Sequence, residues 1–203
     1  KNLCKTYDRN QVLDHFSCTF REKKMTCIMG KSGIGKSTLL SILMGLEKAD
    51  EGTVSGMEHQ KISAIFQENR LFENLDAVTN IHITTGKTKE EITGFLKKME
   101  LDDIAGKPVS EYSGGMKRRV AIARALLAEY DILIMDEPLQ GLDAETKEKV
   151  ATVIKTQTAG KTVLFVTHDR YFLDNVATRI FELEDAGLKE YQGNYQDYLA
   201  KKA

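Results

Sequence analysis

Three uninterrupted apolar runs stand out in the pattern of the chain, at residues 24–29, 131–135 and 162–167. Runs without polar alternation are typical of parallel strands that are covered on both faces. Between the second and third runs, residues 144–158 repeat their apolar side chains at helical spacing. The pattern therefore predicts a strand–helix–strand unit with the usual right-handed crossover.

The start of the chain predicts a β-hairpin, in which residues 1–7 and 12–20 flank a polar turn at residues 8–10. The first predicted strand is already under way at Lys1, and there is no Met before it. We therefore expect that a few residues precede Lys1 in the whole protein.

Shorter segments complete the prediction, as helices at 36–46, 71–81 and 89–99 and as strands at 52–55 and 61–66. The change in pattern between about 69 and 125 predicts a mostly helical insertion. We expect one α/β domain over residues 1–203. It should have an α/β core, an antiparallel β subdomain near the N-terminus and a helical subdomain at about 69–125.

Composition excludes several other classes. The formal charge of −1 over 203 residues gives no field for nucleic acid, so no nucleic-acid partner is expected. No apolar run reaches the roughly 20 residues that cross a bilayer, so a membrane role would require a partner subunit. Cys4, Cys18 and Cys27 are odd in number and lack C-x-x-C spacing, which favours reduced thiols in a cytosolic protein.

Three of the histidines are expected to be structural or to lie on the surface. His15, His59 and His82 have no Cys or carboxylate partner at the sequence spacing of a metal site. A structural role is the commoner one for a lone histidine.

A phosphate loop follows the first apolar run. The pattern G-x-x-x-x-G-K-[ST] stands between a predicted strand and a predicted helix, which is the context the motif requires. Its glycines let backbone N–H groups surround phosphate oxygens at the N-terminus of the helix. Lys36 would reach the β- and γ-phosphates, and the Ser37 hydroxyl would bind Mg²⁺. The predicted ATP-binding residues here are Gly30, Lys31, Ser32, Gly33, Ile34, Gly35, Lys36, Ser37 and Thr38.

Two acidic residues follow the second apolar run. Asp136 comes after four apolar residues and so lies at the carboxyl end of a buried strand, where open parallel sheets bind ligands. Asp136 can hold Mg²⁺ through water, and Glu137 is placed to orient and polarise an attacking water. Two acidic residues that merely end a strand are the simpler alternative.

Between these motifs lies Ser113-Gly114-Gly115, which resembles the LSGGQ signature of ATP-binding cassette (ABC) transporters. The resemblance covers the chain from residue 1 to about 169. In that family the signature opens a helix and contacts the γ-phosphate that the opposite subunit holds. The resemblance therefore implies an α/β fold with a P-loop NTPase core of the ABC ATPase type. It also implies a head-to-tail homodimer that forms around ATP.

Four further positions match the same family. Gln67, after a predicted strand, resembles the Q-loop glutamine that contacts Mg²⁺ and water. His168 resembles the switch histidine at the γ-phosphate, and Asp143 resembles the D-loop aspartate between subunits. Tyr7 matches the aromatic position that stacks on adenine. Each is a weak signal alone, because a lone Gln, His or Tyr is more often structural.

The signature departs from the family pattern at two positions. Met116 stands where the signature usually has Gln, and Tyr112 stands where it usually has Leu. The Ser and both Gly remain, so we expect phosphate contact to survive with altered kinetics at most. The basic triplet of residues 117–119 is expected to be a solvated or subunit-facing helix surface.

Two branches of the family compete for the whole chain. Residues 65–72 and the short helical insertion resemble importer ATPases of the nitrate, sulfonate and taurine type, whereas residues 169–203 resemble the end of an ABC-F domain. The main expectation is an ATPase bound to transmembrane permease subunits, cytoplasmic and peripheral at the inner face of the cell membrane. The alternatives are an ABC-F-like ATPase on ribosomes, a recombined or engineered chimera, and a binding module with incidental hydrolysis. The tyrosines of the tail, Tyr191, Tyr195 and Tyr198, should pack on the core.

Overall fold

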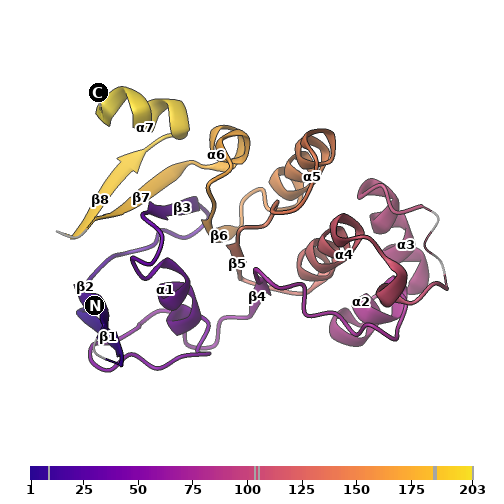
Figure 1. Ribbon diagram of the computed structural model, residues 1–203, viewed down its shortest axis with the longest axis horizontal. Coiled ribbons are helices and arrows are strands. Elements are labelled where there is room, and N and C mark those ends of the chain that lie inside the picture. The colour runs from indigo at the N-terminus through magenta and orange to yellow at the C-terminus, as the bar shows by residue number, and fades with distance from the viewer. Residues whose placement is uncertain (9, 103, 105, 185–186, 203) are drawn as a thin grey trace.

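The computed structural model describes residues 1–8, 10–102, 104, 106–184 and 187–202. A six-stranded sheet with the order β4-β5-β6-β3-β7-β8 forms its centre (Figure 1). Neighbouring strands from β4 to β7 pair in parallel, and β8 pairs with β7 in antiparallel fashion. The strands are β3 (Met25–Gly30), β4 (Ile62–Ile65), β5 (Ile132–Asp136), β6 (Thr162–Val166), β7 (Arg179–Glu184) and β8 (Gly187–Gln192).

Helices cover both faces of this sheet, which explains the uninterrupted apolar runs. Cys27 and Phe165 contribute to a cluster with residues of α2 to α6, whereas Ile28 and Leu164 belong to a cluster with α1. Successive strand residues point to opposite faces, so a strand that is covered on both faces is apolar at most of its positions. The α/β prediction is confirmed.

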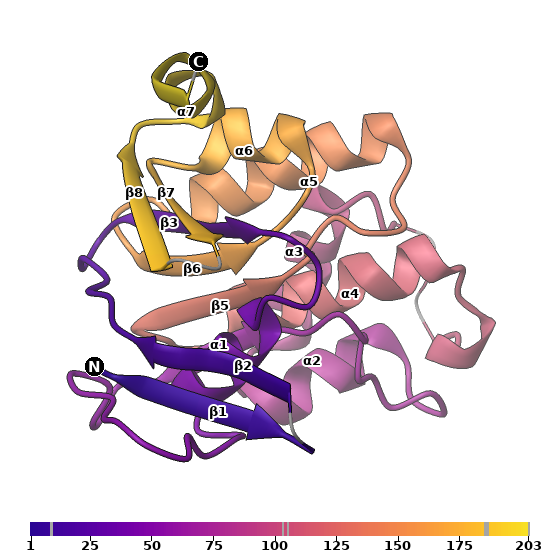
Figure 2. The ribbon, with the colours of Figure 1, turned by 60° about the vertical axis from the view of Figure 1, so that its left-hand side comes forward.

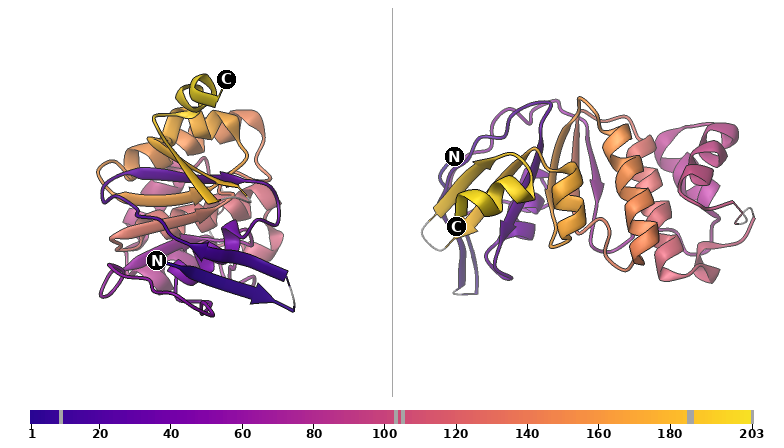
Figure 3. Two further views of the ribbon diagram at one scale, coloured as in Figure 1. Left: turned by 90° about the vertical axis from the view of Figure 1, so that its left-hand side faces the viewer. Right: turned by 90° about the horizontal axis from the view of Figure 1, so that it is seen from above.

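Seven α-helices occur in the part of the chain that the structure describes, with a short 3₁₀ turn, η1 (Val109–Glu111). Helices α2, α3 and α4 gather at one end of the molecule (Figures 1 and 3). Five of the helices follow an Asp, Thr or Ser residue whose side chain accepts a hydrogen bond from a backbone N–H of the first turn. These capping residues fix where the five helices start. The helices are α1 (Lys36–Leu43), α2 (Ala77–Thr85), α3 (Lys89–Lys98), α4 (Gly114–Leu127), α5 (Ala144–Gln157), α6 (Arg170–Val176) and α7 (Tyr195–Lys202).

The predicted hairpin forms a separate two-stranded sheet of β1 (Leu3–Tyr7) and β2 (Asn10–Phe16), close to α1 (Figure 2). Its register shifts between the pairs Leu3↔Phe16 and Lys5↔Leu13. The second strand ends at Phe16, four residues before the predicted end.

One predicted strand does not form, and one predicted helix starts later than expected. Residues 52–55 form no strand, because the chain turns at Gly52 with φ +93, and a Cβ there would lie 2.3 Å from the carbonyl oxygen of Asn2. The second predicted helix begins only at Ala77, capped by Asp76. The residues before it form a loop held by the buried Asn80 side chain, which donates to the carbonyls of Phe72 and Leu75.

The tail packs on the core, as predicted. Tyr198 is buried and donates a 2.8 Å hydrogen bond to Glu182 of β7. Its ring makes an edge contact with Tyr191 and a stacked contact with Tyr195. None of the helices among the described residues is long and apolar enough to cross a bilayer.

Candidate nucleotide-binding site

A cavity of about 820 Å³ opens at the carboxyl ends of the central parallel strands. This is the edge at which open α/β sheets bind ligands. Residues from the phosphate loop, from the ends of β4, β5 and β6 and from the start of α1 line it together. They include Ser32, Gly33, Gly35, Lys36, Ser37, Thr38, Gln67, Asp136, Glu137, His168 and Asp169.

The phosphate loop joins β3 to α1 and lines one side of the cavity. Gly35 directly precedes α1 with φ +97, and a Cβ at this position would lie 2.5 Å from the carbonyl oxygen of Val12. Only glycine therefore allows the loop to pack so closely against the hairpin. The backbone then enters α1 with its N–H groups directed toward the loop.

Lys36 lies folded beneath this loop. Its Nζ donates to the carbonyl oxygens of Gly30 at 2.8 Å and Lys31 at 2.7 Å. Burial lowers the pKa of Lys36, and the charges of Glu137 and Asp136 oppose that shift. The ammonium group is thus held at the loop by weak neutral partners, which an anionic phosphate would replace favourably.

Oxygen donors suited to Mg²⁺ meet next to the loop. The Ser37 hydroxyl donates to Asp136 Oδ2 at 2.8 Å, and Gln67 lines the same cavity two residues after the end of β4. Hydroxyl, carboxylate and amide oxygens are the hard ligands that Mg²⁺ prefers. The chemistry of this donor set therefore matches the predicted metal.

Glu137 is aimed across the cavity by an uncommon backbone conformation, with φ +46. Its Oε2 accepts hydrogen bonds from the Thr167 hydroxyl at 3.0 Å and from the His168 backbone N–H at 3.3 Å. The Nε2 atom of His168 lies 3.8 Å from Glu137 Oε1. The carboxylate and the imidazole, which follow different strands, thus share one site.

Some predicted site residues lie outside this cavity. Tyr7 is 41% exposed at the end of β1, and Asp143 caps α5 through a hydrogen bond from the Thr146 backbone N–H. Gly30 and Lys31 line an adjoining cavity together with His168, and Ile34 belongs to the cluster around α1.

The signature segment is likewise absent from the described walls of the cavity. Ser113 caps α4 by accepting a hydrogen bond from the Met116 backbone N–H at 3.2 Å, and Gly114 and Gly115 form the first turn of this helix. Gly115 lies beside Leu142, just before α5. One copy of the chain therefore does not bring the signature to its own phosphate loop.

The expectation for the basic triplet is wrong at Arg118, which is only 3% exposed. Its guanidinium donates to the carbonyl oxygens of Phe66 at 2.5 Å and Glu137 at 2.6 Å. Burial lowers the pKa of Arg118 to about 10, although the negative charges of Asp136 and Glu137 raise it. The guanidinium is therefore charged at neutral pH. Its further acceptors are the carbonyls of Gln67, Asp136 and Pro138 and the side chain of Asn69.

Arg118 thereby joins three segments that the sequence presents separately, namely α4, the segment of Gln67 and the segment of Glu137. No motif indicated this role, because all but one of the acceptors are backbone carbonyls, which leave no trace in residue identities. The signal that the sequence offered for this role was a charged residue between Gly115 and Val120, on the otherwise apolar side of α4.

The strand–loop–helix unit, the magnesium-type donors and the carboxylate opposite them define a P-loop nucleoside triphosphatase. The known relatives refine this class. The model of the ABC transporter family matches residues 13–140. The chain is 32% identical to the thiamine import ATP-binding protein ThiQ of Shigella flexneri, over 93% of this chain and 88% of that protein.

It is also 32% identical to ABC transporter F family member 5 of Arabidopsis thaliana, over 99% of this chain but 30% of the plant protein. Among solved structures, the dimeric bacterial ABC transporter cassette MJ0796 superposes with a TM-score of 0.83 and 31% identity. The match covers 95% of this chain and 97% of that one. The chain belongs to the ABC transporter family and has the fold of its ATPase cassettes.

Several of the curated relatives are considerably longer. The chain spans 38% of the length of YfmR, an ABC transporter ATP-binding protein of Bacillus subtilis, with which it shares 33% identity.

Proposed function

We propose that this cassette hydrolyses ATP to ADP and phosphate and thereby powers solute transport through membrane permease subunits at the inner face of the cell membrane. The observation that carries the proposal is the cavity in which Lys36, the Ser37–Asp136 pair and Glu137 face one another. The importer subunit ThiQ, which this chain matches along most of both lengths, supports the link to transport.

In this mechanism the chain's own groups bind and orient the reactants. Lys36 and the backbone N–H groups of residues 31–38 hold the β- and γ-phosphates, and Tyr7 stacks on adenine. Ser37, Asp136 and Gln67 would hold Mg²⁺, which would supply positive charge to neutralise the phosphates. Glu137 accepts a hydrogen bond from the attacking water and directs its oxygen toward the γ-phosphorus.

His168 then binds the γ-phosphate from the other side. It is 65% exposed at its side chain, so it can move from Glu137 toward a phosphate oxygen. Arg118 donates to the carbonyls of Gln67 and Glu137 and to those of the two residues that flank Glu137. It therefore keeps the water-binding carboxylate and the amide at a fixed separation. Arg118 is a positioning residue in this scheme.

A second copy of the chain completes the site. Ser113, Gly114 and Gly115 begin α4, where the first backbone N–H groups have no carbonyl partner within the helix, yet they do not line their own cavity. We assign them to the γ-phosphate that the partner copy holds, with Asp143 at the contact between the copies. ATP therefore acts as part of the dimer interface.

Phosphate release and molecular mass, measured with and without ATP, test this proposal. Purified chain should hydrolyse ATP and shift from monomer toward dimer when ATP is added. Lys36→Ala, which removes the phosphate-binding ammonium, should abolish both effects. A chain that neither binds nor hydrolyses ATP would overturn the proposal.

A second candidate function is an ABC-F-like ATPase that acts on ribosomes. It is favoured by the C-terminal unit of β7, β8 and α7, and by the plant F-family relative, which aligns over 99% of this chain. Affinity purification of the tagged protein from its host separates the two candidates. Recovery of a membrane permease supports transport, and co-sedimentation with ribosomes supports the ABC-F function.

We also propose a particular branch of the family for each part of the chain. A body of the nitrate, sulfonate and taurine importer type, joined near residue 169 to an ABC-F-type tail, is consistent with the resemblances of the two parts. Sequencing the genomic locus tests whether the junction is natural, because one uninterrupted native reading frame would reject an engineered chimera.

A further inference from the structure

A cluster of possible metal ligands lies in the β1–β2 hairpin, away from the nucleotide cavity. The register shift between Leu3↔Phe16 and Lys5↔Leu13 leaves Cys4 opposite two residues of β2, Asp14 and His15. Such a bulge turns two consecutive side chains toward one partner, whereas a regular strand would point them to opposite faces. The exposed side chain of His15 agrees with the expected surface position, but the fold gives it a Cys and a carboxylate neighbour that the sequence spacing did not indicate.

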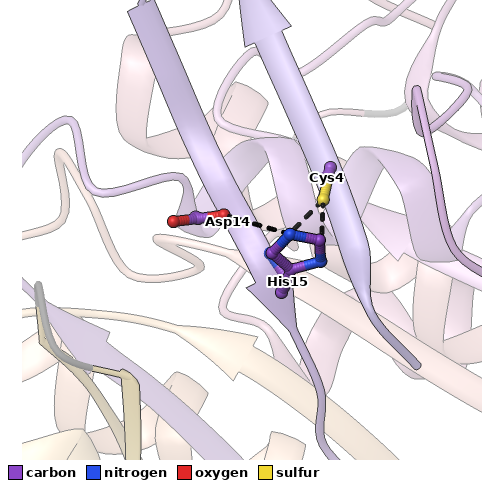
Figure 4. A group of neighbouring side chains, drawn as sticks. All are labelled: Cys4, Asp14 and His15. Atoms are coloured by element: carbon purple, nitrogen blue, oxygen red, sulfur yellow. Dashed lines mark hydrogen bonds and ion pairs between the residues drawn. The ribbon is translucent and has the colours of Figure 1, made fainter.

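The three side chains approach one another closely. Figure 4 shows the Cys4 sulfur and the Asp14 carboxylate facing the ring of His15. Cys4 Sγ lies 3.6 Å from His15 Nδ1, and Asp14 Oδ1 lies 3.9 Å from His15 Nε2. One ligand atom from each residue can be chosen so that all three lie within 4.8 Å of one another. Among the described residues this is the one such group.

The separation of Cys4 Sγ and His15 Nδ1 is close to that of two ligands on one tetrahedral ion, whereas the Asp14 carboxylate faces the other ring nitrogen and must rotate to join them. Zinc–sulfur and zinc–nitrogen bonds of roughly 2.3 and 2.05 Å place the two ligand atoms about 3.6 Å apart. The side chains of Asp14 and His15 are each 71% exposed, so small rotations can bring their ligand atoms together. Exposure also admits the ion and leaves room for a water as the fourth ligand.

Two local features favour a built arrangement. His15 has φ +43, a conformation that is costly for a residue with a side chain, and it turns the imidazole toward Cys4. Asp14 Oδ1 accepts a 3.0 Å hydrogen bond from Gln11 Nε2, which orients the carboxylate. Outer partners of this kind hold metal ligands in place.

We propose that Cys4, Asp14 and His15 bind a divalent ion of the zinc type. A thiolate, an imidazole and a carboxylate form a mixed donor set that Zn²⁺ accepts and that Mg²⁺ and Ca²⁺ do not prefer. As the metal–sulfur bond forms, the Cys4 thiol loses its proton to solvent. The ion would tie β1 to β2 and stabilise the hairpin that carries Tyr7.

Cobalt substitution tests the site directly on the full chain. Co²⁺ titration should produce a near-ultraviolet thiolate-to-cobalt charge-transfer band and the visible bands of a tetrahedral ion, and Zn²⁺ should abolish them. Cys4→Ser should remove the charge-transfer band. His15→Ala and Asp14→Asn should each weaken Zn²⁺ binding at least about tenfold, because the first removes a ligand and the second replaces an anionic ligand by a neutral amide.

Matched controls use the chain's other thiol and imidazole groups. Cys18→Ser and His59→Ala should leave the cobalt spectrum unchanged, and circular dichroism should show each variant folded. A charge-transfer band that survives in Cys4→Ser, or that disappears in Cys18→Ser, would overturn the proposal. So would the absence of any cobalt spectrum in the folded wild-type chain. ATP turnover is not part of the readout, so the result is independent of the nucleotide site.

Discussion

Replacement of Arg118 by Met tests how the nucleotide site is held in shape. The substitution keeps an unbranched side chain on α4 but removes all the guanidinium donors. Five backbone carbonyls lose a partner, including those of Gln67 and Glu137, and the shortest bonds are those to Phe66, Glu137 and Pro138. Arg118→Met would also leave the uncommon backbone conformation at Glu137 without the hydrogen bond that supports its carbonyl.

The expected loss of stability follows from these bonds. Each of the three shortest contributes about 1–1.5 kcal/mol, since its acceptor is left without a partner when the donor is removed. A buried methionine requires no charge desolvation, which returns about 1 kcal/mol. The net loss is about 2–3.5 kcal/mol, and for a domain of this size it lowers the melting temperature by roughly 4–14 °C.

The kcat of Arg118→Met should fall by more than the loss of folded protein alone would explain. A shift of Glu137 by about 1 Å from the attacking water is enough to lower kcat about 100-fold. Affinity for ATP should change less than about threefold, because Arg118 does not contact the phosphate loop. Steady-state phosphate release gives kcat, and fluorescent nucleotide titration gives the affinity, both at a temperature where the variant is fully folded.

Arg124→Met is the matched control. Arg124 lies on the same helix and donates to the carbonyls of Asn69 and Arg70, which follow Gln67 in the chain, and among the described residues it makes no hydrogen bond to the segment of Glu137. Its replacement should lower the melting temperature while kcat stays within about twofold of the wild type. If Arg118→Met also leaves kcat within about twofold of the wild type, the positioning role is refuted.

Other contacts give three further expectations. Glu137→Gln should retain ATP binding and ATP-dependent dimers but slow phosphate release by about a hundredfold or more, and unchanged turnover would reject Glu137 as the water-orienting group. Burial raises the pKa of Asp169, but hydrogen bonds from Lys147 and from a backbone N–H outweigh that effect, so the net pKa lies below 3.8. The stabilisation by Asp169 is therefore complete above pH 3.8 and lost as the pH falls through the lower folded value. The difference in unfolding free energy between wild type and Asp169→Asn should shrink across that window, and a constant difference would contradict the assignment. Tyr198→Phe removes the donor to the buried Glu182 and should destabilise the chain by about 1–2 kcal/mol in urea unfolding, whereas an unchanged midpoint would exclude this bond as a support of the tail.

The sequence alone determined those features that depend on local pattern. Parallel strands that are covered on both faces are mostly apolar, so β3, β5 and β6 were visible as runs. The phosphate loop was visible because its chemistry requires glycine, lysine and serine at fixed spacing, and Lys36, Ser37 and Asp136 do meet. The tail tyrosines were predicted to pack on the core, and Tyr198 is buried there.

Local propensity failed where a distant side chain decided the backbone. The start of α2 was misplaced because Asn80 binds the carbonyls of the preceding loop, and this competes with helix formation across residues 71–75. The strand at 52–55 was wrong because the turn at Gly52 packs against the backbone of Asn2, about fifty residues away.

Tertiary structure alone decided how distant groups pair. Arg118 looked like a surface charge, yet it is buried because the carbonyl oxygens of two other segments satisfy its donors. His15 looked isolated, yet a one-residue register shift turns it toward Cys4. Backbone acceptors and strand register carry no residue code, so the sequence shows which groups a site requires, whereas the folded chain decides which further groups hold them in place.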